Sequence, residues 1–345
     1  MNSADPLASL PPLPAEQDLP APERTRAMVL AGVRPGRTLG LPQPARRLVY
    51  PLAAAAAVAV IVTVLAVVLP GLTRPSHGNT PTSQLGASPT SPGTHINTYA
   101  RPVGALVIRD GNGTVTVSGS QRHSVRVTMT ITDPVRQGAV ASKLSHGTLQ
   151  LTYSATGCGS GRRNCPRVNY SVEVPRSLLV QVVSDAGDVS VNGVSGSVHV
   201  VDQAGDVGLG QISGPAATVY ASAGSVTLAA VSTAQLTVHD AAGDVNGTGL
   251  ASPATTMGAA AGDLSLQYSS VPDMVSLTDS AGDITLRLPL GVTAYRVSAH
   301  SDAGSAKVGV PQSPSAGRTI TARADAGDIT ISDGLPARVP QAGRP

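Results

Sequence analysis

The chain has 345 residues, with 37 Gly and 28 Pro but no Phe, no Trp and only 7 Tyr. Charged residues make up 13%, about half the usual share, whereas hydrophobic residues stand at an ordinary 41%. So few aromatic rings argue against proteins that stack single-stranded nucleic acid on aromatic side chains. Any core must be built from Val, Leu, Ile and Ala, which suit thin, regular layers.

The net charge of +3 hides a segregation along the chain. Residues 75–183 carry ten basic and three acidic side chains, whereas residues 184–334 carry five basic and fourteen acidic ones. A nucleic acid would therefore meet one basic and one strongly acidic stretch, so we expect no nucleic-acid partner despite a pI near 9.1.

Residues 49–72 are predicted to form one transmembrane α-helix. The stretch from Val49 to Leu69 is almost wholly apolar, and its 21 residues span roughly 30 Å, the thickness of a bilayer's hydrocarbon core. Arg46 and Arg47 precede it, so the positive-inside rule places the N-terminus in the cytoplasm and the rest outside the plasma membrane. The segment would contact membrane lipid.

Two other interpretations of the apolar stretch were weighed. A cleaved signal peptide is disfavoured because the stretch is long and begins late in the chain. A buried helix of a soluble domain is disfavoured because nothing downstream has the spacing of a helix that could pack against it.

The segments around this helix have biased compositions. Residues 1–48 are rich in Pro, Ala and Arg and are predicted to be a disordered cytoplasmic tail. Residues 73–98 are rich in Pro, Ser and Thr and are predicted to be a flexible linker. The remaining chain is predicted to form one extracytoplasmic domain over 99–334, followed by a short tail over 335–345.

A turn motif, Ala-Gly-Asp or Ala-Gly-Ser, recurs eight times between residues 184 and 334. Successive glycines are 18, 19, 19, 19, 20, 22 and 23 residues apart, which indicates a repeat architecture. The glycines of the eight copies are Gly187, Gly205, Gly224, Gly243, Gly262, Gly282, Gly304 and Gly327.

Apolar residues keep register with these glycines. One pair falls two and four residues after the glycine, as in Val207 and Leu209, and a second falls about 11 to 15 residues after it, as in Ala217 and Val219. Such alternation predicts two short strands in each repeat, each with one buried face.

One such coil is too small to bury its own apolar face, whereas stacked coils bury a continuous core. The predicted fold is therefore all-β, a parallel β-solenoid of about 8–10 rungs in which each strand pairs with its equivalent one period later. Residues 184–334 are the regular rungs. Residues 99–183 are predicted to be degenerate early rungs, because Gly113 is followed by Val115 and Val117 at the same offsets. A thin interior should leave little room for aromatic rings.

The order of these segments resembles a bacterial family of candidate adhesins built from β-strand repeats. The likeness covers roughly 105–334, from VIRDGNGTVTVSG through RVNYSVEVP and LLVQVVSDAGDVSVNG to the repeated turns. It implies a β-solenoid on an exported or membrane-anchored protein. The family has no established catalytic residues to carry over.

Aspartates surround the repeated glycines in two sets. Six follow the glycine, and stacking would place their carboxylates about 5 Å apart: Asp188, Asp206, Asp244, Asp263, Asp283 and Asp328. Ca²⁺ could relieve the repulsion, because it prefers several oxygen ligands from loops. We favour instead aspartates that cap the turns by accepting backbone N–H bonds, because Ser225 and Ser305 interrupt the series. The second set precedes the glycine: Asp185, Asp202, Asp240, Asp279, Asp302 and Asp325.

Cys158 and Cys165 are the chain's only cysteines, in the Arg-rich loop CGSGRRNC. Outside the cytoplasm a pair this close is expected to form a local disulfide. A metal site would need further Cys or His ligands at suitable spacing, and we expect neither a metal nor a cofactor there.

Catalysis is not expected. Histidines 199, 239 and 300 lie at or beside predicted strands, but no established nucleophile, metalloprotease or phosphate-binding motif surrounds them. Some parallel β-helices are polysaccharide lyases, yet residues 184–286 contain neither Lys nor Arg.

The leading functional hypothesis is a single-pass envelope protein whose solenoid has a structural, adhesive or binding role at the cell surface, where envelope polymers or surface proteins would be its partners. The alternatives are an envelope sensor that signals through its cytoplasmic tail and, less favoured, a carbohydrate-active enzyme.

Overall fold

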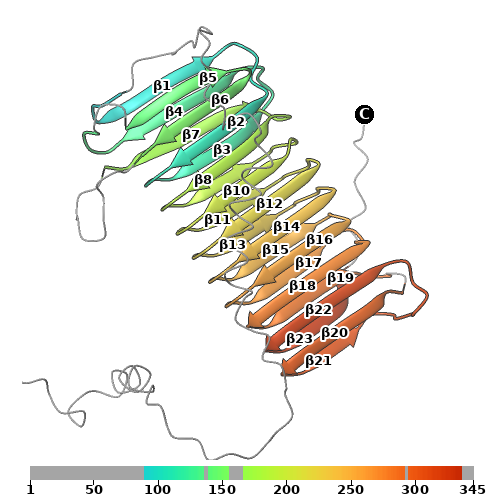
Figure 1. Ribbon diagram of the computed structural model, residues 1–345. Coiled ribbons are helices and arrows are strands. Elements are labelled where there is room, and N and C mark those ends of the chain that lie inside the picture. Colours follow the sequence, from blue (N-terminus) through green and yellow to red (C-terminus); the bar gives the residue numbers. More distant parts are fainter. Residues whose placement is uncertain (1–88, 136–138, 155–165, 292–293, 336–345) are drawn as a thin grey trace, which may run out of the picture. The chain divides into compact units, whose positions relative to one another are not determined.

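A computed structural model describes residues 89–135, 139–154, 166–291 and 294–335, which form strands and turns without any helix (Figure 1). The all-β prediction is confirmed for this part of the chain. None of the described residues belongs to a helix long and apolar enough to cross a membrane. The predicted transmembrane segment, residues 49–72, lies outside the described residues, as do the predicted cytoplasmic tail, residues 1–48, and residues 336–345.

The strands form two sheets, which we call sheet A and sheet B. Sheet A has twelve strands in the order β1 (Gly93–Tyr99), β4 (Val125–Ile131), β7 (Val168–Pro175), β3 (Val115–Ser120), β9 (Val189–Asn192), β11 (Val207–Gly210), β13 (Val226–Ala229), β15 (Val245–Leu250), β17 (Leu264–Tyr268), β19 (Ile284–Pro289), β23 (Ile329–Leu335) and β21 (Ala306–Gly309). Sheet B has eleven strands in the order β20 (Arg296–Ala303), β22 (Thr319–Ala326), β18 (Met274–Ala281), β16 (Ala254–Ala259), β14 (Gln235–Asp240), β12 (Ala216–Ala221), β10 (Val198–Asp202), β8 (Leu179–Ser184), β2 (Ala105–Asp110), β6 (Thr148–Tyr153) and β5 (Val140–Ser145).

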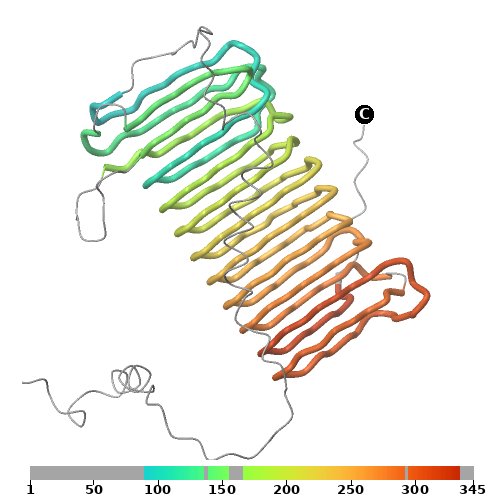
Figure 2. The backbone as a smooth tube through the Cα atoms, in the orientation of Figure 1, coloured from blue at the N-terminus to red at the C-terminus, as the bar shows by residue number. Residues whose placement is uncertain are grey.

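Each regular rung contains one strand from each sheet. The chain runs along a strand of sheet B, passes through the Ala-Gly-Asp turn, returns along a strand of sheet A and enters the next rung through a second turn (Figure 2). From β8 to β19 each strand pairs in parallel with its equivalent one period later, as in Val207 with Val226 and Val198 with Ala217. Three strands pair antiparallel and do not belong to the rungs: β1 and β4 of sheet A and β5 of sheet B. Ten parallel strands remain in each sheet, so the described residues form ten rungs.

At both ends the stacking order departs from the sequence order. The last rung in sequence, β22 and β23, lies between β18–β19 and β20–β21. The first rung, β2 and β3, likewise lies between β6–β7 and β8–β9. The prediction that each strand pairs with its equivalent one period later is therefore wrong at the two ends of the stack. Repeats with the same turn and strand pattern are interchangeable as hydrogen-bonding partners, so the repeat spacing alone does not determine which one is inserted.

The N-terminal end is closed by antiparallel strands, contrary to the expectation of early rungs alone. β4 pairs antiparallel with β7, β5 with β6, and β1 with β4. β1 also begins at Gly93, inside the predicted linker 73–98. Its apolar residues are too few to stand out from the polar composition around them, and pairing with β4 supplies its backbone partners.

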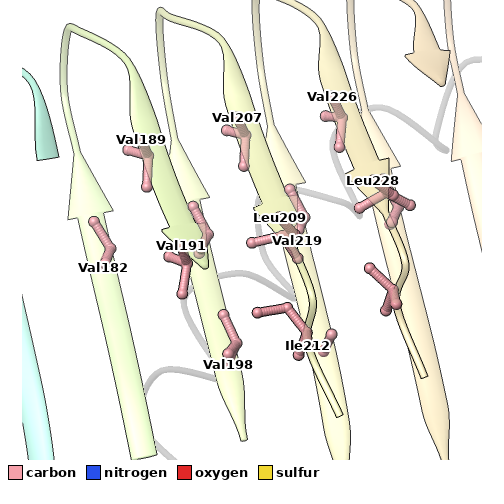
Figure 3. Close-up of a cluster of buried hydrophobic side chains, with 14 of the residues drawn as sticks. Val182, Val189, Val191, Val198, Val207, Leu209, Ile212, Val219, Val226 and Leu228 are labelled. Carbon is pink, nitrogen blue, oxygen red and sulfur yellow. The ribbon is translucent and has the colours of Figure 1, made fainter. Parts of the chain in front are cut away.

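The core lies between the two sheets and consists of columns of aliphatic side chains. Figure 3 shows Val189, Val207 and Val226 in equivalent positions of successive rungs, with Val191, Leu209 and Leu228 forming the next column. A further column fills the second turn of each rung, where Val194, Ile212 and Val231 are fully buried. Because this column lies in turns, the alternating strand pattern did not reveal it.

Five tyrosines belong to the buried core, contrary to the expectation that the interior excludes rings. Tyr99, Tyr153 and Tyr170 lie near the N-terminal end, and Tyr268 and Tyr295 lie toward the C-terminal end. The hydroxyls of Tyr153 and Tyr295 donate to the carbonyls of Pro166 and Pro272, at 2.6 and 2.8 Å. The buried tyrosines therefore lie toward the two ends of the stack, and none is buried in the described rungs from β8 to β15.

The repeated glycine is required because successive turns touch through their backbones. A Cβ built on Gly243 would lie 2.1 Å from the Gly224 carbonyl oxygen, and one on Gly262 would lie 2.1 Å from that of Gly243. The Gly243 amide in turn donates to the Ala261 carbonyl at 2.9 Å. Since both contacts are to backbone atoms, no side-chain rotation can relieve the clash.

We predict that Gly243→Ala destabilises the domain by roughly 2–5 kcal/mol, because neighbouring rungs must separate to admit the methyl group. Gly208→Ala is the matched control: its added Cβ would have no heavy atom nearer than 3.9 Å. Thermal and denaturant unfolding of both variants test this, and equal stabilities for the two would contradict the close-packing account.

Candidate functional site: the stacked acidic turns

The Ala-Gly-Asp turns stack into one acidic edge of the solenoid. The six aspartates that follow the glycine are all exposed on it, and Asp185, Asp302 and Asp325 are exposed beside them. We call this surface the acidic turn edge. Over residues 184–286 it contains no Lys or Arg, so its negative charge is not neutralised by basic residues within that stretch.

The exposed aspartates hold neighbouring rungs together. The Asp263 Oδ1 accepts a bond from the Asp283 amide at 2.8 Å, and the Asp244 Oδ1 accepts one from the Asp263 amide at 2.9 Å. The same contact joins Asp188 to Asp206, Asp206 to Ser225, Asp283 to Asp328 and Asp328 to Ser305. Each aspartate thus caps the turn of the following rung, whereas the sequence had suggested a cap for its own turn. These amide dipoles offset part of the repulsion between stacked carboxylates.

The stacking order shows that only one of the two serines, Ser225, interrupts the column of exposed aspartates. Ser305 belongs to the outermost rung and ends the column, so it interrupts nothing. Ser225 does interrupt the column, between Asp206 and Asp244. At the other end Asn169 continues the same pattern, because its Oδ1 accepts the Thr114 amide at 3.0 Å. Asn169 was missed in the sequence because it lies in an irregular rung without an Ala-Gly-Asp motif.

A second column of carboxylates lies inside the solenoid, behind the turn edge. Asp110, Asp202, Asp240 and Asp279 are at most 4% exposed, and each precedes a turn glycine by three residues. The second set predicted from sequence therefore divides in two. Asp202, Asp240 and Asp279 point inward, whereas Asp185, Asp302 and Asp325 are one residue nearer the glycine and exposed. Asp110 was missed, although its spacing to Gly113 is the same.

Small side chains separate these buried carboxylates. Along sheet B the order at this position is Asp110, Ser184, Asp202, Ala221, Asp240, Ala259, Asp279, Ala324 and Ser301. Two buried aspartates are therefore two strand spacings apart, about 9.6 Å. The alternation keeps like charges from stacking in adjacent rungs.

The buried carboxylates are only partly satisfied by hydrogen bonds. The Asp240 Oδ1 accepts the Ala242 amide at 3.3 Å, and the Asp279 Oδ1 accepts the Ala281 amide at 3.1 Å. Their Oδ2 atoms, and both oxygens of Asp110 and Asp202, have no hydrogen-bond partner among the described residues. Unpaired buried oxygens of this kind favour the neutral acid over the carboxylate.

Burial accordingly raises the pKa of Asp110 to about 7, with a further rise from the charge of Asp185. Burial also raises the pKa of Asp202 and of Asp279 to about 6 each. The pKa of Asp240 is raised for the same reason. By contrast, the bonds from the Ser305 amide and hydroxyl hold the pKa of exposed Asp328 below its usual value.

The described residues contain no group of three or more His, Cys, Asp or Glu side chains arranged to hold a metal ion. In the candidate Ca²⁺ column each bonded Oδ1 already accepts a backbone amide of the neighbouring turn. Cys158 and Cys165 lie outside the described residues, so their disulfide stays a prediction.

The histidines do not assemble with a nucleophile in this part of the structure. His199 and His239 flank Tyr220 on the outer face of sheet B, with ring centroids 5.9 and 5.3 Å from the tyrosine ring. Burial lowers the pKa of both histidines. His300 lies elsewhere, near the C-terminal end, and bonds Asp302 at 2.7 Å.

Parallel rungs, stacked glycine turns and a repeated carboxylate cap define this chain as a β-solenoid repeat protein. The family described as Toastrack DUF4097 matches residues 103–332, and the chain belongs to that family. No curated protein matches the sequence.

Several solved structures resemble the chain at low sequence identity. A candidate cell adhesion protein from Clostridium sporogenes is 12% identical, with a TM-score of 0.30, and the match covers 71% of this chain and 100% of that one. A candidate adhesin from Bacteroides fragilis is 13% identical, with a TM-score of 0.39 and coverage of 71% and 99%. A candidate lipid-binding protein from Parabacteroides distasonis is 12% identical, with a TM-score of 0.33 and coverage of 72% and 98%.

Removing one carboxylate cap should weaken the stack. We predict that Asp263→Ala lowers stability by about 1 kcal/mol, because the Asp283 amide loses its acceptor. Asp263→Asn keeps an acceptor oxygen and should remain close to the parent protein. Unfolding of both variants with and without added Ca²⁺ provides the measurement. A calcium-dependent rise in melting temperature that disappears in Asp263→Ala would contradict the amide-capping role.

The buried column predicts that stability depends on pH. Because the folded-state pKa values of about 6 to 7 lie above the unfolded value near 3.9, the folded state binds more protons than the unfolded chain in this range. The buried-column contribution to stability should therefore be complete below about pH 4 and fall as pH rises through about 7.

At pH 8 we expect Asp202→Asn to raise the melting temperature, by about 2–4 °C for each kcal/mol that the substitution adds to the free energy of unfolding. The substitution should also make the melting temperature depend less on pH. Asp325→Asn is the exposed control and should leave the profile unchanged, because the charge of Asp325 contributes to none of the raised pKa values of the buried column. Melting curves between pH 5 and pH 8 test this, and an identical profile for parent and Asp202→Asn would refute the buried-charge account.

Proposed function

We propose that the chain is a single-pass, N-in protein of the bacterial envelope whose solenoid has a structural, adhesive or binding role outside the membrane. The observation that carries the proposal is the acidic turn edge. It repeats the same exposed carboxylate from rung to rung, so it offers a partner many equivalent weak contacts rather than one enclosed site.

The surface chemistry supports a binding role. Strand faces of the regular rungs display Ser, Thr and Gln outward, and the turn edge adds a row of carboxylates. Such a surface suits a partner with many hydrogen-bond donors or positive charges along its length, such as an envelope polymer or the surface of another protein. The family resemblance and the predicted anchor over residues 49–72 support a location of this surface outside the membrane.

Cross-linking from two alanines tests the role of the turn edge. Ala242 is exposed in an Ala-Gly-Asp turn, and Ala234 is exposed at the opposite turn of the preceding rung. We expect a photoreactive residue at position 242 of the full chain to capture an envelope component in intact cells, while the same residue at 234 captures far less. Equal capture from both positions, or capture only of cytoplasmic proteins, would contradict the proposal.

Deleting residues 1–45 separates this role from a sensor role. The shortened chain should keep its membrane association and its cross-links from position 242, because the predicted anchor and the solenoid are intact. A sensor would keep the cross-links but lose its cellular response. The third possibility, a carbohydrate-active enzyme, would release product from purified envelope glycans, and we expect none.

A further inference from the structure

Among the described residues, the C-terminal end of the stack leaves two strand edges without a pairing partner. β20 is the last strand of sheet B and β21 the last of sheet A, and both belong to the same rung (Figure 1). Each pairs on its inner side only, β20 with β22 and β21 with β23. An open edge with unpaired amides and carbonyls is a template for another strand.

The side chains of this rung show that its inner face is also incompletely covered. Val297, Ala299 and Val308 point inward but are only partly buried. Their counterparts one rung further in, Ile320, Ala322 and Ile331, are at most 1% exposed. At the opposite end, Val140 and Leu144 of the outermost strand β5 are 1% and 7% exposed. The core is therefore closed at the N-terminal end and open at the C-terminal end.

Backbone direction determines which groups of β20 are available. The Arg296 amide donates inward to the Arg318 carbonyl at 2.9 Å. Neighbouring residues of a strand direct their backbone groups to opposite sides, so those of Val297, Ala299 and Ser301 point away from β22. Tyr295 fits this alternation, because its amide donates to the Pro311 carbonyl at 2.9 Å on that other side. The open pairing stretch is therefore 297–301.

The same stretch is complementary to itself about Ala299. In an antiparallel pair centred on this residue, Ala299 faces Ala299 of a second copy and exchanges both backbone bonds with it. Val297 then faces Ser301, and Ser298 faces His300 at the intervening non-hydrogen-bonded positions. The pairing ends there, because the Tyr295 carbonyl already accepts the Ser313 amide at 2.9 Å on the open side.

From this geometry we propose that two copies of the chain join end to end through antiparallel pairing of their β20 strands about Ala299. The two copies are related by a two-fold axis perpendicular to the sheets. This axis places sheet B of one copy next to sheet B of the other and sheet A next to sheet A, so the two β21 strands also lie side by side. Val308 stands four residues after Gly304 and Ala299 five before it, so both lie at nearly the same distance from the turn. The join would bury Val297, Ala299 and Val308 from both copies and extend the core across the interface.

A proline at the centre of the join tests the pairing. Ala299→Pro removes an amide that points to the open side, so the isolated chain tolerates it as an edge-strand proline. Two intermolecular hydrogen bonds are lost by symmetry, and we expect the dimer dissociation constant to rise by at least about tenfold. Ala299→Ser keeps the amide and is the matched control.

Sedimentation of the full chain in a nonionic detergent gives the masses, and melting curves show that both variants are folded. The proposal requires a dimer for the parent and Ala299→Ser, and monomer for Ala299→Pro. A parent protein that stays monomeric, an equally dimeric Ala299→Pro, or a series of larger assemblies from head-to-tail stacking would overturn it.

A cysteine cross-link tests the register independently of affinity. The two Ala299 positions would be about 5.5 Å apart between Cα atoms, within the range that a disulfide spans. Ala299→Cys should form a covalent dimer under mild oxidation, with the 299–299 bond identified by peptide mass spectrometry. Thr256→Cys, exposed in a strand paired on both sides, should give none. Equal cross-linking of the two variants, or none at 299, would contradict the pairing.

Discussion

The whole stack depends on how closely the Ala-Gly-Asp turns approach one another. At each of these turns the glycine carbonyl of one rung lies where a side chain of the next would begin, as between Gly224 and Gly243. This contact sets the rung spacing at the turns to the same value that strand pairing sets in the sheets. Turns and strands therefore stack in one register, and the aliphatic columns between the sheets remain continuous over the ten rungs.

The close approach of the turns also brings carboxylates of neighbouring rungs together, and their mutual repulsion is reduced in two ways. On the outside, the carboxylate of one rung accepts the amide of the next, which leaves one oxygen exposed and holds the charge in a regular row. On the inside, buried aspartates alternate with Ala or Ser, and burial raises their pKa values toward neutrality. The charge of the inner column therefore varies with pH near neutrality, where the pKa values of Asp202 and Asp279 lie.

The sequence was sufficient to predict the repeated unit. Period-2 alternation after Gly205 or Gly224 leaves one buried face for each strand, and the fixed period leaves stacking as the way to cover it. The distinction between the two aspartate columns was not recognised, because Asp202 and Asp185 differ only by one residue in their distance from the glycine. That one residue reverses the side-chain direction.

The order of the end rungs was also not predictable from repeat spacing. β20 and β22 have equivalent strands and turns, and both can hydrogen-bond to a neighbour in the same register. The inserted rung carries the larger side chains, because Ile320 and Ile331 occupy the positions that Val297 and Val308 hold in the outer rung. β1 was hidden for a different reason, because its pairing partner β4 is distant in sequence.

Amide hydrogen exchange tests the central claim most directly, namely that carboxylates join one turn to the next. Asp263, Asp283 and Asp328 each donate their backbone N–H to the aspartate of the adjacent rung, whereas Asp244 follows Ser225 and has no such bond among the described residues. We expect slow exchange for the first three amides and fast exchange for that of Asp244. Equal exchange rates for all four amides would contradict it.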